Sequence, residues 1–296
     1  QSRNRRSTRG YYLHLTSEGS AWSGSLGARL EDNQLYGSFF TYQAGVSYSW
    51  GTTGTRFRGN LGKGMKEPTF FETHSTGFSV GNPDLNPEVS RVWEVGVEQA
   101  LGKEGALLTL TWFNQNMDDL IQYTFSPPET GGPNYYNVAE ARSRGLEFTG
   151  HIPVGRLSLS CGYTYLDTEV LDAGFDEGEG AVFVEGEALI RRPSHQISLR
   201  GALDLPRGTV SGSVRMVGNR YDRDFGAWPA APVELERYTL LGLAVDFTVL
   251  QAVGSRPGLQ LQIRGENLLD QAYQEVFGFR APGRSFLVGG RLMFGG

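Results

Sequence analysis

The sequence contains one cysteine, Cys161, among its 296 residues. A single cysteine forms no internal disulfide, no cysteine-based zinc site and no redox pair, and it leaves the redox compartment undecided. The chain also lacks any apolar run near the roughly 18 to 20 residues that a membrane-spanning helix needs. No charged-then-apolar signal segment opens it at Gln1. Helical membrane proteins are therefore excluded.

Clustered positive charge is missing as well. The formal net charge is −5 and the pI is about 5.5, whereas binding to nucleic-acid phosphates requires clustered cations. The basic start of the chain (Arg3, Arg5, Arg6 and Arg9) is too short to change this, so we expect no nucleic-acid partner. Apolar residues make up 39% of the chain, which is low for a protein with a large solid core. Aromatic residues make up 12%, which distinguishes the chain from disordered and collagen-like sequences.

What the sequence does contain is alternation of apolar and polar residues. From Phe40 to Trp50 the apolar residues fall on one face and the polar or small residues on the other. Leu157 to Tyr165 and Leu259 to Glu266 repeat the pattern. Alternation at every second position indicates β-strands, and no sustained helical stripe competes with it, so we expect almost no helix.

The alternating segments predict an all-β protein of about thirteen strands. They lie near residues 10–17, 20–31, 38–50, 54–65, 89–101, 105–116, 134–150, 155–167, 193–205, 208–218, 237–249, 257–268 and 284–294. Many of them reach the length of about 9 to 11 residues that a tilted membrane-spanning strand needs, whereas strands of soluble proteins average about 5 to 6.

The connections between these strands alternate in length. Tight Gly-rich or Pro-rich turns such as Gly51–Gly54 and Leu205–Gly208 take turns with long stretches such as Lys66–Glu88 and Thr168–Arg192. Short turns on one side and long loops on the other are typical of a transmembrane antiparallel β-barrel of the outer membrane, with outer-membrane lipid around it. A soluble β-sandwich also alternates and is the alternative fold.

The number of predicted strands is odd, whereas a complete bacterial barrel normally has an even number. We therefore expect the chain to begin on the extracellular side and to form the C-terminal portion of a larger barrel, as one domain over residues 1–296. An overlooked strand would instead give a complete small barrel, which could act as a passive porin.

Several motifs carry a resemblance to a known family. They are Lys66-Glu67-Pro68-Thr69-Phe70-Phe71-Glu72, Gly81-Asn82-Pro83-Asp84-Leu85-Asn86-Pro87-Glu88, Trp93-Glu94-Val95-Gly96, Tyr135-Tyr136-Asn137-Val138-Ala139-Glu140-Ala141 with Arg144-Gly145-Leu146-Glu147, Gly265-Glu266-Asn267-Leu268-Leu269-Asp270 and Ala281-Pro282-Gly283-Arg284-Ser285-Phe286. In this order the chain resembles the barrels of TonB-dependent outer-membrane receptors. The resemblance implies the last thirteen strands of a barrel of about 22 strands, without its N-terminal plug and TonB-binding box.

Within that family the chain looks most like the cobalamin (vitamin B12) receptors. The likeness lies in Gly218–Phe225 with Trp228-Pro229, and in Tyr273–Phe279. It implies energised import of a large scarce ligand, cobalamin first and a siderophore or haem second, driven by the TonB complex through the plug. The calcium-binding loops of those receptors would fall outside this chain, and we expect no cofactor and no enzymatic activity.

Two sets of residues are candidates for function. The candidate ligand-binding residues in the outer loops are Tyr221, Asp222, Asp224, Phe225, Trp228, Tyr273, Phe277, Phe279 and Arg280, because an aromatic rim suits a bulky ligand. A second set consists of charged residues that the alternation places on the polar side of their strands. We expect them to face the barrel interior, because an arginine facing lipid at mid-depth is costly. The resemblance implies that such residues contact the plug. This set comprises Arg56, Arg58, Arg144, Arg200, Arg215, Arg264 and Glu266.

Three other features have a weaker chemical interpretation. The four histidines are scattered, without metal-ligand spacing, although His74 falls where haem receptors often place an axial histidine. Ser194 and His195 are adjacent on a predicted strand, so they point to opposite faces and cannot act as a catalytic dyad. An acidic loop could offer oxygen ligands to calcium, but its spacing does not match an EF-hand. Its carboxylates are Asp167, Glu169, Asp172, Asp176, Glu177, Glu179, Glu185 and Glu187.

Overall fold

The computed structural model describes residues 5–102, 104–125, 127–174, 180–254 and 256–294. Within them lie seventeen strands and one short helix. The elements are β1 (Thr8–Glu18), β2 (Trp22–Asn33), β3 (Gly37–Trp50), β4 (Thr55–Lys66), α1 (Phe70–His74), β5 (Glu88–Leu101), β6 (Ala106–Tyr123), β7 (Tyr135–Val154), β8 (Leu157–Asp172), β9 (His195–Leu205), β10 (Gly208–Val217), β11 (Arg220–Asp224), β12 (Ala231–Leu235), β13 (Tyr238–Leu250), β14 (Gly258–Glu266), β15 (Gln274–Val276), β16 (Phe279–Arg280) and β17 (Ser285–Met293).

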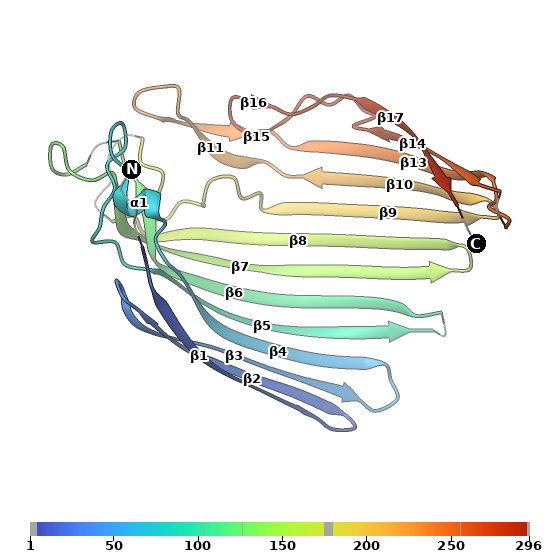
Figure 1. Ribbon diagram of the computed structural model, residues 1–296, viewed down its shortest axis with the longest axis horizontal. Helices are drawn as coiled ribbons and strands as arrows, with labels where there is room; N and C mark the ends of the chain where they lie inside the picture. Colours follow the sequence, from blue (N-terminus) through green and yellow to red (C-terminus); the bar gives the residue numbers. More distant parts are fainter. Residues whose placement is uncertain (1–4, 103, 126, 175–179, 255, 295–296) are drawn as a thin grey trace.

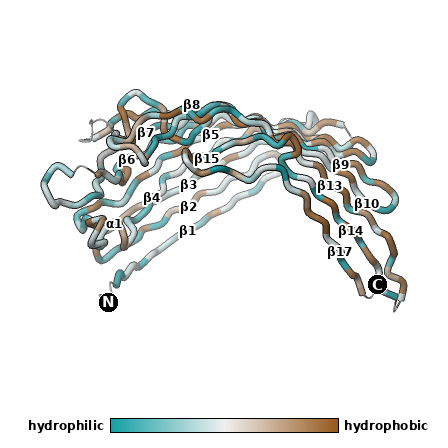
Figure 2. The backbone as a smooth tube through the Cα atoms, turned by 90° about the horizontal axis from the view of Figure 1, so that it is seen from above, coloured by the Kyte–Doolittle hydropathy of each residue, from teal (hydrophilic) through white to brown (hydrophobic). Residues whose placement is uncertain are grey.

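Thirteen of the strands form one antiparallel sheet, in the order β1-β2-β3-β4-β5-β6-β7-β8-β9-β10-β13-β14-β17. Every pair of neighbours in this sheet is consecutive along the chain once the two small hairpins are set aside. The sheet bends into an open arch with β1 and β17 at its two free edges (Figure 2). The all-β prediction and the number of long strands are confirmed.

The connections at one end of the sheet are short turns, and the long connections all lie at the other end, together with the three-residue turn between β2 and β3 (Figure 1). The odd number of strands places the described N-terminal residues among the long loops and the C-terminus at the turn end. The tight turn between β3 and β4 needs left-handed backbone at Gly51 (φ 50°) and Gly54 (φ 75°), a conformation that glycine adopts without steric cost. This sorting of connections is the one expected of an outer-membrane barrel.

Cross-strand register divides the side chains into two faces. One row of successive partners is apolar and runs through Tyr48, Phe57, Val97, Leu110, Phe148 and Tyr163. The adjacent row is polar or small and runs through Ser47, Arg58, Gly96, Thr111, Glu147, Thr164 and Gln196. We call these the apolar face and the polar face. A hollow of about 910 Å³ opens on the polar face of β7 to β14, so the polar face is the concave one.

The structure differs from the sequence prediction mainly at the loop end. Strand β6 runs to Tyr123 rather than to residue 116, and a bulge near Asp119, whose φ is 56°, separates its two parts. A bulge breaks the alternation by which strands are recognised. The hairpins β11–β12 and β15–β16 and the five-residue α1 are also additions within predicted loops. No helix in the described part of the chain is long and apolar enough to cross a membrane.

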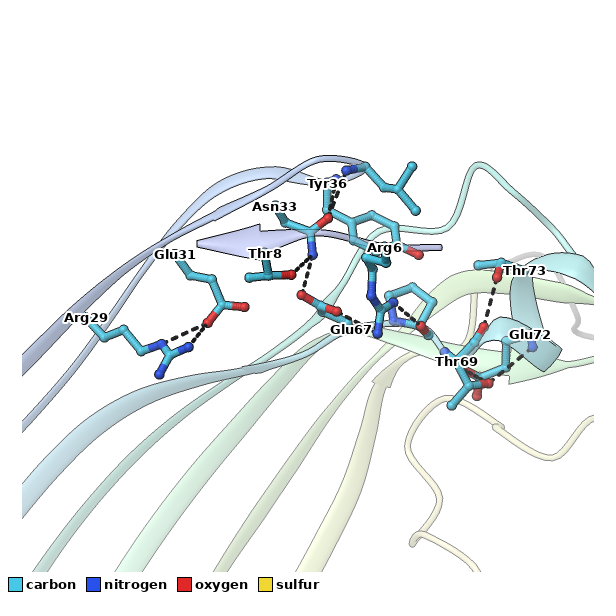
Figure 3. A network of polar contacts seen from close by, with 12 residues as sticks. Arg6, Thr8, Arg29, Glu31, Asn33, Tyr36, Glu67, Thr69, Glu72 and Thr73 are labelled. Atoms are coloured by element: carbon cyan, nitrogen blue, oxygen red, sulfur yellow. Dashed lines mark hydrogen bonds and ion pairs between the residues drawn. The ribbon is translucent and has the colours of Figure 1, made fainter. Parts of the chain in front are cut away.

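A buried polar network fixes the loop end of the first strands (Figure 3). Asn33, which is 2% exposed, donates from Nδ2 to Thr8 Oγ1 at 3.0 Å and to Glu67 Oε1 at 2.5 Å. The other oxygen of Glu67 lies 2.7 Å from Arg6, which donates to the carbonyl of Pro68. Burial raises the pKa of the nearby Tyr36 hydroxyl, an effect that Arg6 opposes. Part of the Lys66-Glu67-Pro68 motif therefore has a structural purpose.

The remaining motif residues fasten the loops in the same way. Thr69 and Glu72 form a capping box at the start of α1. Asn82 Nδ2 donates to the carbonyl of Tyr135 at 2.8 Å, and Asn86 and Asn137 bond each other reciprocally at 2.6 and 2.8 Å. These contacts tie the connection after β4 to the start of β7. The motifs on which the resemblance rests hold the scaffold of the loop end.

Candidate functional site

The outer loops enclose a cavity of about 770 Å³, which we call the aromatic loop pocket. Its walls come from the end of β6, from three connections (β4 to β5, β6 to β7 and β8 to β9) and from the turn between β11 and β12. The lining residues are Phe78, Ile121, Gln122, Tyr123, Thr124, Phe125, Gly180, Val182, Phe183, Phe225, Ala227, Trp228, Pro229 and Ala230. Among the residues that the structure describes, Tyr123 is the one ionisable side chain in this lining. A concave, mostly apolar site with a few polar groups is typical of small-molecule binding.

Aromatic side chains from different loops build the pocket. The rings of Phe125 and Trp228 meet edge to face at 5.7 Å, and Phe125 meets Tyr123 at 4.9 Å. Trp228 is 71% exposed and Phe78 is 90% exposed, so both leave large ring surfaces open to a ligand. Gly180 (φ 96°) allows the β8–β9 connection to approach the hairpin turn, because a Cβ there would lie 2.9 Å from the amide nitrogen of Ala230.

One polar group in the lining has no protein partner. Gln122 is 3% exposed, and neither its Oε1 nor its Nε2 makes a hydrogen bond within the part of the chain that the structure describes. Leaving a buried polar group unsatisfied costs about 1–3 kcal/mol. A carboxamide offers both donors and an acceptor, so a ligand group that complements it would remove this cost.

Asp222 is the centre that positions the hairpin carrying Phe225 and Trp228. Its side chain has no exposed area. One oxygen accepts from Arg191 Nε at 2.9 Å and the other from the amide of Phe277 at 2.8 Å. The prediction that Asp222 binds ligand directly is at odds with this burial, and Asp222 instead joins β11 to two neighbouring segments. Asp224, two residues later, accepts from the amide of Gly226 within the hairpin turn.

The other candidate ligand residues lie apart from the pocket. Tyr221 is exposed and lines a different hollow, described below. The ring of Tyr273 packs against Tyr238 with centroids 4.4 Å apart and the planes tilted by 33°, and Tyr273 borders the hollow on the polar face. Phe277, Phe279 and Arg280 belong to the turn and second strand of the separate β15–β16 hairpin, where Phe279 is 73% exposed. Of the nine candidates, the structure brings Phe225 and Trp228 together in one cavity.

Six of the seven residues expected in the interior share the polar face. Arg56 and Arg58 lie 3.7 and 3.4 Å from Glu98 and donate to Ser47 and Thr111. Arg200 and Arg215 border the hollow on the polar face together with Glu266. Arg264 is the partner of Ala244 across the strands and lies 3.8 Å from Glu266.

Arg144 is the exception, and its predicted face is wrong. Its cross-strand partners are Asn114 and Asp167. Arg144 lies two and four residues before Leu146 and Phe148 on β7, so it points to the same side as they do, the apolar face. It lies toward the loop end of β7, where its Nε is 2.8 Å from Asp167. An arginine on the outer face is costly at mid-depth but costs little near the membrane boundary.

The features with weaker chemical interpretations remain dispersed. His74 is the exposed last residue of α1, and its Nδ1 lies 2.7 Å from Thr73 Oγ1. The ring of His195 hydrogen-bonds the hydroxyl of Tyr163 at 2.9 Å. In the acidic loop, Asp167 and Glu169 pair with arginines of β7, and Glu187 lies 3.9 Å from Arg223. Asp176, Glu177 and Glu179 fall outside the described residues.

Sequence reasoning missed most of the pocket. Phe78, Phe125 and Phe183 come from three different connections, and Gln122 lies at the end of β6. Only the fold brings these residues to Phe225 and Trp228. A usable signal was the presence of bulky apolar residues in long polar loops. Nothing in the sequence pattern marks Gln122.

Comparison with known proteins gives two findings. The protein-family model described as TonB dependent receptor-like, beta-barrel matches residues 1–268. Among solved structures, the chain is similar to the ferric-catecholate import receptor Fiu from K12 E. coli (TM-score 0.73, 16% identity, 97% of this chain and 44% of that one). It is also similar to the siderophore receptor PiuA from Acinetobacter baumannii (0.73, 18%, 97% and 43%).

A third similar structure is a mutant of the ferric enterobactin receptor PfeA from Pseudomonas aeruginosa (TM-score 0.71, 17% identity, 96% of this chain and 44% of that one). At these identities the likeness concerns the fold. The chain spans less than half the length of each of the three structures.

Proposed function

The chain belongs to the TonB-dependent receptor β-barrel family, and from this premise we propose that it acts in energised import of a ferric siderophore-type chelate across the outer membrane. The observation that supports a ligand site is the aromatic loop pocket with its unpartnered Gln122. The pocket lies at the loop end of the sheet, the end that faces outward in this class of barrel.

The choice of an iron chelate follows the similar structures, which are described as ferric-catecholate, ferric enterobactin and siderophore receptors. The loop motifs point to cobalamin first, but none of these three structures is described as a cobalamin receptor. We therefore place a siderophore ahead of cobalamin. Haem stays a second candidate through His74, which is exposed at the end of α1.

The lining of the pocket suggests which part of the chelate it would take. Its rings suit a planar aromatic group, which would stack on Trp228 or Phe125. Its described lining offers no cationic side chain, so this part of the pocket is unsuited to the anionic iron centre itself. We assign the pocket to an aromatic arm of the chelate that carries an amide or hydroxyl group, which would hydrogen-bond Gln122.

Transport would then depend on the polar face. This face carries charged groups suited to contact with a plug domain, namely Arg56, Arg58, Glu98, Arg200 and Glu266. In the proposed mechanism, TonB pulls on that plug after the ligand is captured, and the plug moves against these groups. Partly exposed ion pairs are individually weak, so such contacts could exchange without a large barrier.

The proposal predicts selective binding at the pocket. With the protein expressed from its complete gene, a ferric tris-catecholate chelate should bind more tightly than cyanocobalamin in a fluorescence-quenching titration. Trp228→Ala and Gln122→Leu should each weaken chelate binding about tenfold, which corresponds to about 1.4 kcal/mol. Trp50→Ala, at the turn end, is the matched control and should leave affinity unchanged. Tight cyanocobalamin binding without chelate binding would return cobalamin to first place.

A further inference from the structure

A second hollow, of about 960 Å³, lies where β9, β10 and β13 meet the β11–β12 hairpin. We call it the rim hollow. Its lining includes Arg192, His195, Ile197, Met216, Glu234 and Arg237. We propose that the rim hollow binds the phosphate headgroup of an anionic outer-leaflet lipid.

The position of the rim hollow supports a lipid. The register pairs His195 with Tyr165, Ile197 with Tyr163, and Met216 with both Ile197 and Thr239. These residues therefore belong to the apolar face, at its loop end, whereas Val217 and Tyr238 of the same lining belong to the polar face through the pairing of Val217 with Gln196. The rim hollow thus lies at the upper edge of the sheet and opens beside the apolar face. Ile197 and Met216 continue directly into the apolar row below them, which includes Leu199 at 44% exposure. An acyl chain could lie along this row while its headgroup occupies the hollow.

The charge of the rim hollow supports a phosphate. Arg192 and Arg237 are exposed, and among the residues that the structure describes neither has an ion pair or a side-chain hydrogen bond. Glu234 is the one carboxylate among the described residues of the lining, and its Oε1 accepts from Asn219 Nδ2 at 2.8 Å. The planar guanidinium fork matches the geometry of a phosphate, and basic pockets at a membrane boundary bind anionic headgroups.

Arginines near the loop end of the sheet differ in whether they pair with a carboxylate. Arg91, Arg142 and Arg144 lie on the apolar face near the loop end, and each pairs with a carboxylate: Asp118, Glu169 and Asp167 respectively. Arg192 and Arg237, which line the rim hollow, have no such partner among the described residues. Beside them, the ring of His195 lies against Tyr163 and Tyr165 with centroids 6.1 and 5.3 Å apart. Aromatic side chains of this kind are enriched at the membrane boundary.

The inference rests on the outer-membrane location in the proposed function, but not on the imported ligand. We would express the protein from its complete gene and purify it in neutral detergent. Native mass spectrometry would then measure binding of diphosphoryl lipid A and of the same lipid after removal of both phosphates. The double variant Arg192→Gln/Arg237→Gln should bind diphosphoryl lipid A at least tenfold more weakly than the wild type. Arg156→Gln/Arg207→Gln is the matched control, because both arginines are exposed at the turn end.

Equal binding by the double variant, or equal binding of the dephosphorylated lipid, would overturn the proposal. Displacement of the lipid by millimolar inorganic phosphate would also overturn it, since that would indicate a site for a free anion. Chelate binding should be unchanged in the double variant, because neither arginine lines the aromatic loop pocket. Failure of the lipid site can thus be told apart from failure of the proposed function.

Discussion

Replacing Val245 with arginine is expected to destabilise the folded protein in a bilayer by about 2–4 kcal/mol, the range for a cation at mid-depth on the lipid side of a barrel. Val245 lies near the middle of β13, and its cross-strand partners Val210 and Ile263 belong to the same apolar face. The expectation follows from the division of the sheet into two faces.

The neighbouring position supplies the control. Ala244 belongs to the polar face, with Ser211 and Arg264 as its cross-strand partners. Ala244→Arg introduces the same side chain one residue away and should be tolerated. The free energy of unfolding would be measured in urea for both variants after reconstitution into lipid vesicles. Equal destabilisation, or greater loss in Ala244→Arg, would show that the two faces have been assigned the wrong way round.

Removing the carboxylate of Asp222 is the second change expected to have a large effect. Asp222→Ala leaves Arg191 and the amides of Arg223 and Phe277 without their acceptor. Breaking a buried charged pair costs about 3–5 kcal/mol, and we expect the lower end because the Arg191 side chain is 34% exposed. The β15–β16 hairpin should separate from β11, so trypsin should cleave faster after the exposed Arg280.

Asp224→Ala is the comparison for this variant. Asp224 lies in the same hairpin but accepts its described hydrogen bond from Gly226, within one turn. In a urea titration, Asp224→Ala should lower the free energy of unfolding less than Asp222→Ala does. It should also leave the rate of trypsin cleavage after Arg280 unchanged. If the two variants unfold and are cleaved alike, Asp222 does not connect the loops.

The long strands could be predicted from the sequence because a sheet between lipid and a wet interior must alternate at every second residue. This physical requirement ends at the membrane boundary. There β6 continues past a bulge at Asp119 and the short strands β11, β12, β15 and β16 form from loop residues without a pattern. Arg144 shows the same limit, because the energetic argument that points arginines inward applies only at mid-depth.

The candidate site could be predicted only in part. The sequence proposes aromatic residues of the outer loops as ligand contacts, and the structure places two of them, Phe225 and Trp228, in one cavity; their contact with a ligand stays a prediction. Asp222 could not be distinguished from a ligand-binding acid, because its burial depends on contacts with Arg191 and Phe277 that the sequence does not reveal. Gln122, at the end of β6, is identified because its side chain has no hydrogen-bond partner among the described residues, and this is a property of the folded structure.

The central claim is energised import of an iron chelate, and uptake of a ⁵⁵Fe-labelled tris-catecholate chelate tests it most directly. Cells that lack their own catecholate receptors would express the protein from its complete gene, with and without a functional TonB. The account predicts accumulation of ⁵⁵Fe that needs TonB and stops when a protonophore collapses the inner-membrane proton gradient. Accumulation that persists without TonB and in the presence of the protonophore would contradict it and would favour a passive pore.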